Sequence, residues 1–443
     1  MALPASGQID FGQIQTEFGG SNPISMNEYG DEIGLTIGTT SIHDIADFYG
    51  LSASVDEDIP IGTYLEYDTR STWSIYDFEC DIAFDENVAG RFAIIYRHVS
   101  TTPNVGYVKI GNISGTGANR TVTMGSAYSV GSSSGIYEFP SICFDPHNSN
   151  KFLIIFGDIS NGYDPGVRIG TITNDDEVSF GTVAYVSSQI SYYMDAEFDP
   201  NTANRVLLTY KDSVSNQQYG LVKVGTVSGT SISFGAASSF SGTDKAWHIR
   251  MAFDPNNANK FVVVWTDIND NSEGNARVGT ISGTSVSWGT TVIFHSTNQE
   301  VRDITFDANT AGKFVVAYRD TGNSNKATCI VGTLSGTSVS FGSEYVASVS
   351  SYSTYIRCSY DRNQANTFVI TWRENNKLYA KVGTVSGTSI SYGSVKTLFA
   401  LSNGRSEIAF DANTAGVFAV AWQYIGGSPY VARGRVSLGQ VAT

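Results

Sequence analysis

One phrase recurs seven times along this chain and constrains its fold more than any other feature. Its clearest copies read FDPNTANRVLLTYKD from Phe198, FDPNNANKFVVVWTD from Phe253 and FDANTAGKFVVAYRD from Phe306. An anchor aspartate marks each copy, and successive anchors lie between 50 and 60 residues apart, at Asp85, Asp145, Asp199, Asp254, Asp307, Asp361 and Asp411. A fixed period of this size predicts a repeat fold, in which each unit buries its apolar faces against its neighbours.

Each repeat divides into four short strand patterns separated by turn signals, and no segment is typical of a long helix. The second strand is a near-continuous apolar run, such as residues 261–265, which indicates burial on both faces. The third and fourth strands meet at Ser-Gly-Thr-Ser, as in residues 228–231, where glycine in the first central position fits a type II′ hairpin. Four antiparallel strands repeated seven times predict an all-β fold, a seven-bladed β-propeller of four-stranded blades.

The residue five positions after each anchor is always glycine or asparagine. The seven copies are Gly90, Asn150, Asn204, Asn259, Gly312, Asn366 and Gly416. These two residue types adopt a positive φ at least cost, so we expect a left-handed backbone there in every blade.

The two ends of the repeat region predict how the ring closes. The seventh repeat supplies three strands, from Glu407 to Val436, and then reads SLGQVAT without a fourth strand. Residues 59–69 match the fourth-strand pattern of the other repeats, so we expect them to form the outer strand of the last blade. This arrangement leaves no open sheet edge at the junction. The predicted domains are an attachment and oligomerisation module, residues 1–52, and the propeller, residues 53–443.

Composition and charge exclude several classes of protein. The formal charge of −15 argues against nucleic acid and against an anionic membrane surface as partners. No apolar run approaches the roughly 20 residues of a membrane span, and the first residues lack the basic and apolar regions of a signal peptide. The four cysteines show no CxxC spacing and the five histidines are scattered, so we expect buried free thiols, no metal site and no cofactor.

The loops on the two rims of the predicted propeller differ in how faithfully they repeat. The DPN-type turns and the SGTS hairpins of one rim are nearly constant, whereas the loops of the other rim differ from blade to blade, which leaves them available to a partner. Tyrosine and tryptophan among small polar residues suit saccharide or protein binding, although such rings can also cap the core between blades. The predicted stacking residues on the variable rim are Trp73, Tyr76, Tyr137, Tyr192, Tyr193, Trp247, Tyr352 and Tyr355.

A second pattern lies three residues before the aromatic residue that precedes each anchor. Around the ring it reads Asp81, Ser141, Asp195, Arg250, Asp303, Arg357 and Glu407. Opposite charges in neighbouring blades predict ion pairs around the channel mouth that hold the blades in register. The functional interpretation is a polar pocket for an anionic or sugar ligand, with Arg250 and Arg357 as polar contacts.

The sequence holds no recognisable catalytic motif. Repeated S-x-D-x-G-x-T-W boxes, a P-loop, an HExxH pair and a Ser-His-Asp arrangement are all missing. We therefore expect a protein that is not an enzyme, although blades bring distant carboxylates together.

The N-terminal segment carries a resemblance to a known group of proteins. Its opening, MALPASGQIDFGQIQTEFGG, with ISMNEYG and a closing IADFYG, resembles the N-terminal module of virion structural proteins in tailed bacteriophages, especially marine and cyanobacterial ones. The resemblance covers residues 3–51, and the repeats containing VGTVSGTSISFG also resemble those of phage structural proteins. It implies that residues 1–52 dock onto other virion proteins, that the chain is a homo-oligomer, and that it belongs to a virion assembled in the host cytoplasm.

Together these observations predict a phage structural protein, of a tail fibre or of an appendage on tail or capsid. Its propeller would recognise a glycan or protein of the host surface during adsorption. One alternative is a purely structural decoration or spacer. Another is a glycan-cleaving enzyme, for which Asp81, Asp195, Asp303 and Glu407 are the candidate carboxylates.

Overall fold

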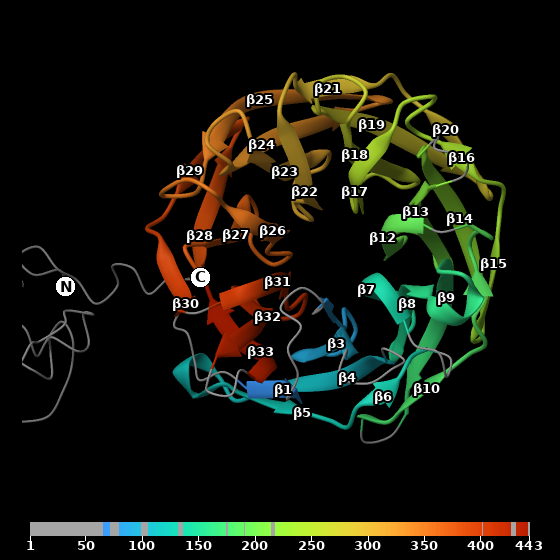
Figure 1. Ribbon diagram of the computed structural model, residues 1–443, viewed down its shortest axis with the longest axis vertical. Helices are drawn as coiled ribbons and strands as arrows, with labels where there is room; N and C mark the ends of the chain where they lie inside the picture. Colours follow the sequence, from blue (N-terminus) through green and yellow to red (C-terminus); the bar gives the residue numbers. More distant parts are fainter. Residues whose placement is uncertain are drawn as a thin grey trace, which may run out of the picture. The chain divides into compact units, whose positions relative to one another are not determined.

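The predicted propeller is confirmed by the computed structural model, which describes residues 65–70, 79–98, 105–131, 136–173, 176–189, 191–213, 218–400, 402–426 and 431–441. Within these residues, seven antiparallel sheets are arranged around a central channel (Figure 1). The predicted module, residues 1–52, and its boundary lie outside the described residues and stay predictions.

In each blade the first strand lies next to the channel, and the second strand pairs with its outer side. The inner strands are β2 (Cys80–Phe84), β7 (Ile136–Phe144), β12 (Ser191–Phe198), β17 (Ala246–Phe253), β22 (Gln299–Phe306), β26 (Thr354–Tyr360) and β31 (Ser402–Phe410). The second strands are β3 (Arg91–His98), β8 (Lys151–Asp158), β13 (Arg205–Asp212), β18 (Lys260–Asp267), β23 (Lys313–Asp320), β27 (Thr367–Glu374) and β32 (Val417–Gly426). Blades are numbered below by their inner strands, from blade 1 (β2) to blade 7 (β31).

The third and fourth strands form the outer half of each blade. The third strands are β4 (Val105–Ser114), β9 (Asp164–Ile172), β14 (Gly220–Ser228), β19 (Glu273–Ser282), β24 (Lys326–Ser335), β28 (Lys377–Ser386) and β33 (Val431–Gln440). The fourth is continuous in β25 (Ser338–Val346) and divided into two pieces in five blades: β5 (Thr121–Met124) and β6 (Tyr128–Ser129), β10 (Val178–Phe180) and β11 (Ala184–Tyr185), β15 (Ser231–Phe234) and β16 (Ser238–Ser239), β20 (Ser285–Trp288) and β21 (Val292–His295), β29 (Ser389–Tyr392) and β30 (Lys396–Ala400). The helices of the described residues are two 3-10 turns, η2 (Gly117–Asn119) and η3 (Ile159–Asn161).

The apolar second strands are buried on both faces, as their sequences predict. In β18 the side chains from Phe261 to Val264 are fully buried. One face of β18 packs against blade 5 and the other against blade 3. Val262 and Val264 pack with Phe306 and Phe314 of blade 5, whereas Phe261 and Val263 pack with residues of blade 3. Each core therefore lies between two blades, and no single blade is a complete folding unit.

The last blade is closed by a strand from before the first repeat, as the ends of the sequence predict. The strand β1 (Leu65–Arg70) pairs antiparallel with β33, with Leu65 opposite Val436 and Arg70 opposite Ala432. The expectation that the third strand of this blade ends near Val436 was wrong, because β33 runs on through SLGQ to Gln440. Its final residues pair with the start of β32, with Gln440 opposite Val417.

The anchor aspartates and the polar residue two positions later link each blade to the next. All seven anchor aspartates are buried. The side chain at the second position reaches a backbone carbonyl of the following blade at every junction: Asn87 to Asp145 (2.8 Å), His147 to Asp199 (3.1 Å), Asn201 to Asp254 (3.4 Å), Asn256 to Asp307 (3.3 Å), Asn309 to Arg362 (3.0 Å), Asn363 to Asp411 (3.2 Å) and Asn413 to Asp85 (3.1 Å). The last of these bonds closes the ring.

Two further predictions about turns are confirmed. The glycine or asparagine five residues after each anchor has a φ between 63° and 74° in all seven blades. In the hairpin after β14, Ser228 pairs with Ser231 and only Gly229 of the two central residues has a positive φ, which matches type II′.

The cysteines and the helices leave little to interpret. The four thiols are free, and three of them, Cys80, Cys329 and Cys358, are buried, while Cys143 is partly buried. Within the described part of the chain, no helix has the length and apolar character needed to cross a membrane.

Candidate functional site: the cationic mouth of the channel

Half of the predicted aromatic stacking residues cannot be assigned to a shared surface. Trp73 and Tyr76 lie outside the described residues, and Tyr137 lies on β7 with its side chain outside the described ones. Tyr352, in the loop before β26, is 68% exposed and stands out on the variable rim. The other four rings lie nearer to the channel.

Three of these rings surround a lysine of their own chain. The Lys211 ammonium lies 4.8 Å from the ring centre of Tyr192, 5.2 Å from that of Tyr193 and 5.1 Å from that of Trp247. Burial lowers the pKa of Lys211 to about 8. Cation–π contact stabilises such a lysine, and the indole of Trp247 also donates to Gln218 (2.8 Å). All three rings therefore have a structural role around Lys211, the alternative stated above for such rings, and Tyr193 also lines the cavity described below.

Bulges in the inner strands turn a second set of side chains towards the channel. The register of β12, β17 and β26 shifts near the mouth, and inside these bulges Tyr193, His248 and Tyr355 have φ values of 53°, 50° and 50°. A bulge redirects a side chain, and a left-handed conformation at such residues costs about 1–3 kcal/mol each. A further bulge in β22 lies between Val301 and Asp303. Backbone strain of this kind is concentrated at functional sites of proteins.

These side chains meet in one cavity of about 230 Å³ at the mouth of the channel. Five consecutive blades, from blade 3 to blade 7, contribute to it. The lining consists of Tyr193, His248, Arg250, Val301, Arg302, Tyr355, Arg357 and Arg405. Four of the predicted site residues, Tyr193, Tyr355, Arg250 and Arg357, are thus brought together, whereas Tyr192, Trp247 and Tyr352 do not line this cavity.

Carboxylates neutralise three of the four arginines. Arg357 pairs with Glu407, Arg405 pairs with Glu79 at 3.0 Å, and Arg302 pairs with Glu300. Arg250 forms no ion pair with any described carboxylate; its guanidinium donates to the backbone carbonyl of the preceding residue, Ile249, at 3.0 Å. Arg250 therefore has no carboxylate at ion-pair distance among the described residues, although its charge partly offsets the raised pKa values of the buried Asp195 and Asp303.

The electrostatic effect of this cluster is visible in its neighbours. Burial and the nearby guanidinium groups of Arg319, Arg357 and Arg250 lower the pKa of Arg302 to about 9. Burial, followed by the same kind of cationic neighbours, holds the pKa of His248 well below its usual range. His248 is therefore neutral near pH 7, and its buried Nδ1 has no hydrogen-bond partner.

Below the mouth, the predicted ring of alternating ion pairs is replaced by a different arrangement. Only Arg357 and Glu407 form such a pair. Asp81 instead accepts the backbone N–H of Ile142 in the next blade (2.9 Å). In blades 3 and 5, Asp195 and Asp303 likewise accept a backbone N–H of the next blade, from Met251 (3.3 Å) and Cys358 (2.8 Å) respectively. The prediction of ion pairs was wrong for these aspartates, which hold backbone N–H groups of the next blade instead.

The four candidate catalytic carboxylates all line a second cavity of about 250 Å³ beneath the mouth. Burial raises the pKa of Asp81 to about 7 and that of Asp303 to about 6, and it also raises the pKa of Asp195. Such shifts are typical of general acids, but these aspartates hold neighbouring backbone N–H groups. These aspartates therefore have a structural role, in which each joins its inner strand to that of the next blade.

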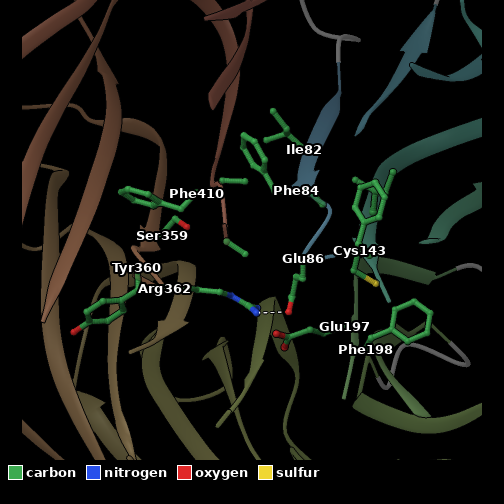
Figure 2. Close-up of a pocket in the computed structure, with 15 residues that line it drawn as sticks. Ile82, Phe84, Glu86, Cys143, Glu197, Phe198, Ser359, Tyr360, Arg362 and Phe410 are labelled. Carbon is green, nitrogen blue, oxygen red and sulfur yellow. Dashed lines mark ion pairs between the residues drawn. The ribbon is translucent and has the colours of Figure 1, made fainter. Parts of the chain in front are cut away.

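At the opposite end of the channel, charged turns line a further cavity (Figure 2). Glu86 and Arg362 each follow an anchor aspartate, in blades 1 and 6, and form an ion pair of 2.5 Å across the channel. Glu197 lies beside them in Figure 2 and accepts the backbone N–H of Phe253 (2.9 Å). Burial raises the pKa of Glu197 to about 8. Arg362 at this end forms an ion pair, whereas Arg250 at the mouth forms none with a described residue.

Sequence analysis missed His248, Arg302 and Arg405. They do not lie at the position three residues before the aromatic anchor, and only the bulges bring them to the channel. The available signal was the run of aromatic and basic residues just ahead of that position, as in YYMD, WHIR and TYIR.

Comparison with solved structures agrees with the fold. No family model and no curated protein matches the sequence. Among solved structures, Sqt1 of Chaetomium thermophilum bound to the N-terminus of ribosomal protein L10 matches with 10% identity and a TM-score of 0.53, over 86% of this chain and 100% of that one. The BP39L lectin of Burkholderia pseudomallei matches with 8% identity and a TM-score of 0.58, over 79% and 93%. At such low identity these similarities show a shared propeller fold alone.

Proposed function

We propose that this protein is a virion structural protein whose propeller recognises a ligand on the host surface, and that the ligand enters the mouth of the channel. The observation that carries this proposal is the convergence of strained side chains on an open cavity. Tyr193, His248 and Tyr355 reach it from three separate blades, each through a bulge with a positive φ. A scaffold that needed only stability would not repeat such a cost three times.

The contrast between the two ends of the channel supports recognition over a purely structural role. At the opposite end, Arg362 is neutralised by Glu86. At the mouth, Arg250 has no carboxylate partner among the described residues, and Nδ1 of His248 and Nε of Arg302 are buried without a hydrogen bond. Buried polar groups without a hydrogen bond cost stability, so stability alone does not explain their presence at the mouth.

The virion part of the proposal rests on the N-terminal segment. Residues 3–51 resemble modules that precede varied domains in phage structural proteins, and that resemblance implies attachment to other virion proteins. Host recognition on the propeller and attachment through residues 1–52 then form one coherent design. The lectin with the same fold supports a saccharide as the kind of ligand that a propeller can hold.

Binding to host cells and to their purified surface polysaccharides tests the function. We expect the full chain to be retained by one of these polysaccharides. Tyr355→Ala should weaken retention about tenfold, because the cavity loses an aromatic ring that a sugar can contact. Tyr128→Ala, on the outer strand β6, is the matched control and should bind as the unchanged protein does. Absence of binding to every host surface and polysaccharide would leave the structural decoration as the function.

A glycan-cleaving activity is the second candidate, because the cavity beneath the mouth holds carboxyl groups with raised pKa values. It predicts new reducing ends when host polysaccharide is incubated with the protein, and their loss in Asp81→Asn. Binding without any new reducing ends would exclude it.

A further inference from the structure

We propose that the mouth of the channel binds a single negatively charged sugar residue, whose carboxylate or sulfate group is held by Arg250. This inference rests on the proposed function, because it names the chemical class of the ligand for the same site. It depends on the charge, the free donors and the size of the cavity.

The charge of the cavity is opposite to that of the molecule. The chain has a formal charge of −15, yet all the charged side chains that line the mouth cavity are arginines. Arg302, Arg357 and Arg405 form ion pairs with glutamates, whereas Arg250 forms none with a described residue and acts on the buried Asp195 and Asp303 without an ion pair. A guanidinium presents a rigid fork of N–H donors that matches the two oxygens of a carboxylate or sulfate, so Arg250 is the group that such an anion would neutralise.

The donors around Arg250 are suited to an oxygen-rich ligand. Among the described residues, the Arg250 guanidinium donates to one backbone carbonyl, and an anionic or hydroxyl oxygen could accept from its other N–H groups. His248 is held neutral by its surroundings, so its ring can donate to one sugar hydroxyl or accept from another. An apolar ligand would leave both groups without partners, at a free-energy penalty.

The size and the aromatic walls point to one ring of a saccharide. At about 230 Å³, the cavity is smaller than the roughly 300–1,000 Å³ typical of sites for drug-sized molecules. Tyr193 of blade 3 and Tyr355 of blade 6 line it together with the arginines. A charged sugar residue at the end of a chain or on a branch could enter, while the neighbouring sugars would stay on the variable rim.

A panel of saccharides in matched pairs tests the inference. Each acidic sugar (a uronic acid, a sialic acid or a galactose sulfate) is immobilised beside its neutral counterpart, which is the parent sugar or the carboxyl-reduced form. We expect the full-length protein to bind acidic members at least tenfold more tightly than their neutral counterparts, and to lose affinity as salt is raised. The comparison of carboxylated with sulfated members identifies which anion is preferred.

Two variants locate the binding. Arg250→Gln should reduce affinity for the preferred acidic sugar at least tenfold, with an unchanged melting temperature. Lys151→Gln, at the start of β8 near the opposite rim, removes the same charge and should leave affinity within a factor of two. Equal loss in both variants would mean that only the overall charge matters, which overturns the assignment to Arg250.

The remaining outcomes separate this inference from the proposed function. Binding to neutral members as tight as to acidic ones would overturn the inference and leave host-surface recognition standing. Failure to bind both the panel and host surfaces would overturn the proposed function, and the inference with it.

Discussion

At the residue scale, the most faithfully repeated positions join blades and the least repeated ones form the mouth. The polar residue two positions after each anchor reaches the following blade at all seven junctions, and the left-handed glycine or asparagine lets the turn form. The bulged residues at the mouth are two tyrosines and a histidine, Tyr193, His248 and Tyr355, and the equivalent position in blade 5 is Val301. Within one chain, positions that repeat in every blade therefore serve the ring, and positions that differ between blades are available for ligand binding.

Asn413 provides the bond that closes the ring, through its amide group and the Asp85 carbonyl (3.1 Å). We expect Asn413→Ala to lower the free energy of unfolding by about 1 kcal/mol, because a partly buried carbonyl loses its donor. Thermal or denaturant unfolding measures this. Asn119→Ala in the exposed turn η2 is the control, and an equal effect of the two substitutions would contradict a special role of the closing bond.

Glu197 predicts an unusual dependence of stability on pH. Its folded pKa of about 8 lies above the ordinary 4.5, so folding favours the protonated form. The contribution of this group to stability is therefore complete below about pH 4.5 and is lost as pH rises through about 8. Glutamine keeps an acceptor for the N–H of Phe253 and cannot ionise.

We accordingly expect Glu197→Gln to melt roughly 2 °C or more above the unchanged protein at pH 9, and at nearly the same temperature at pH 4. Melting curves across this range provide the measurement. A variant that is less stable than the unchanged protein at pH 9 would show that the ionised carboxylate is stabilising.

At the scale of elements, the strand pattern predicted four-stranded blades and the strand that completes the last blade. The near-continuous apolar runs, such as that of β18, gave the correct burial on both faces because period and composition directly reflect two covered faces. The bulges were not predictable, since a bulge depends on how one strand registers with another. His248 and Arg302 could therefore not be assigned to the channel from sequence alone.

The outer strand β1 predicts how much the closure contributes. Deletion of residues 53–70 should lower the melting temperature by many degrees, because β33 then becomes an open edge and the packing of Leu65 on the first core is lost. A chain that lacks only residues 1–52 is the matched control and should melt as the full chain does. Similar melting of both truncated chains and the full protein would refute closure by β1.

At the scale of the whole molecule, the propeller is a ring whose two ends carry different sets of charged side chains. The turn rim places Glu86 against Arg362, whereas the variable rim collects arginines from four adjacent blades around one cavity. The overall fold was predictable because it repeats, and the site was only partly predictable because it arises where the ring brings different repeats together. Arg250 and Arg357 were found through their common position, and Arg405 was not.

The central claim is that the ligand binds at the mouth of the channel. Amide hydrogen exchange of the full chain, with and without the saccharide that it retains, tests this most directly. The account predicts increased protection in the bulged starts of the inner strands, residues 191–195, 246–250 and 354–357, with no change in the turns after the anchor aspartates. Protection confined to those turns or to the outer strands, with the mouth unchanged, would contradict it.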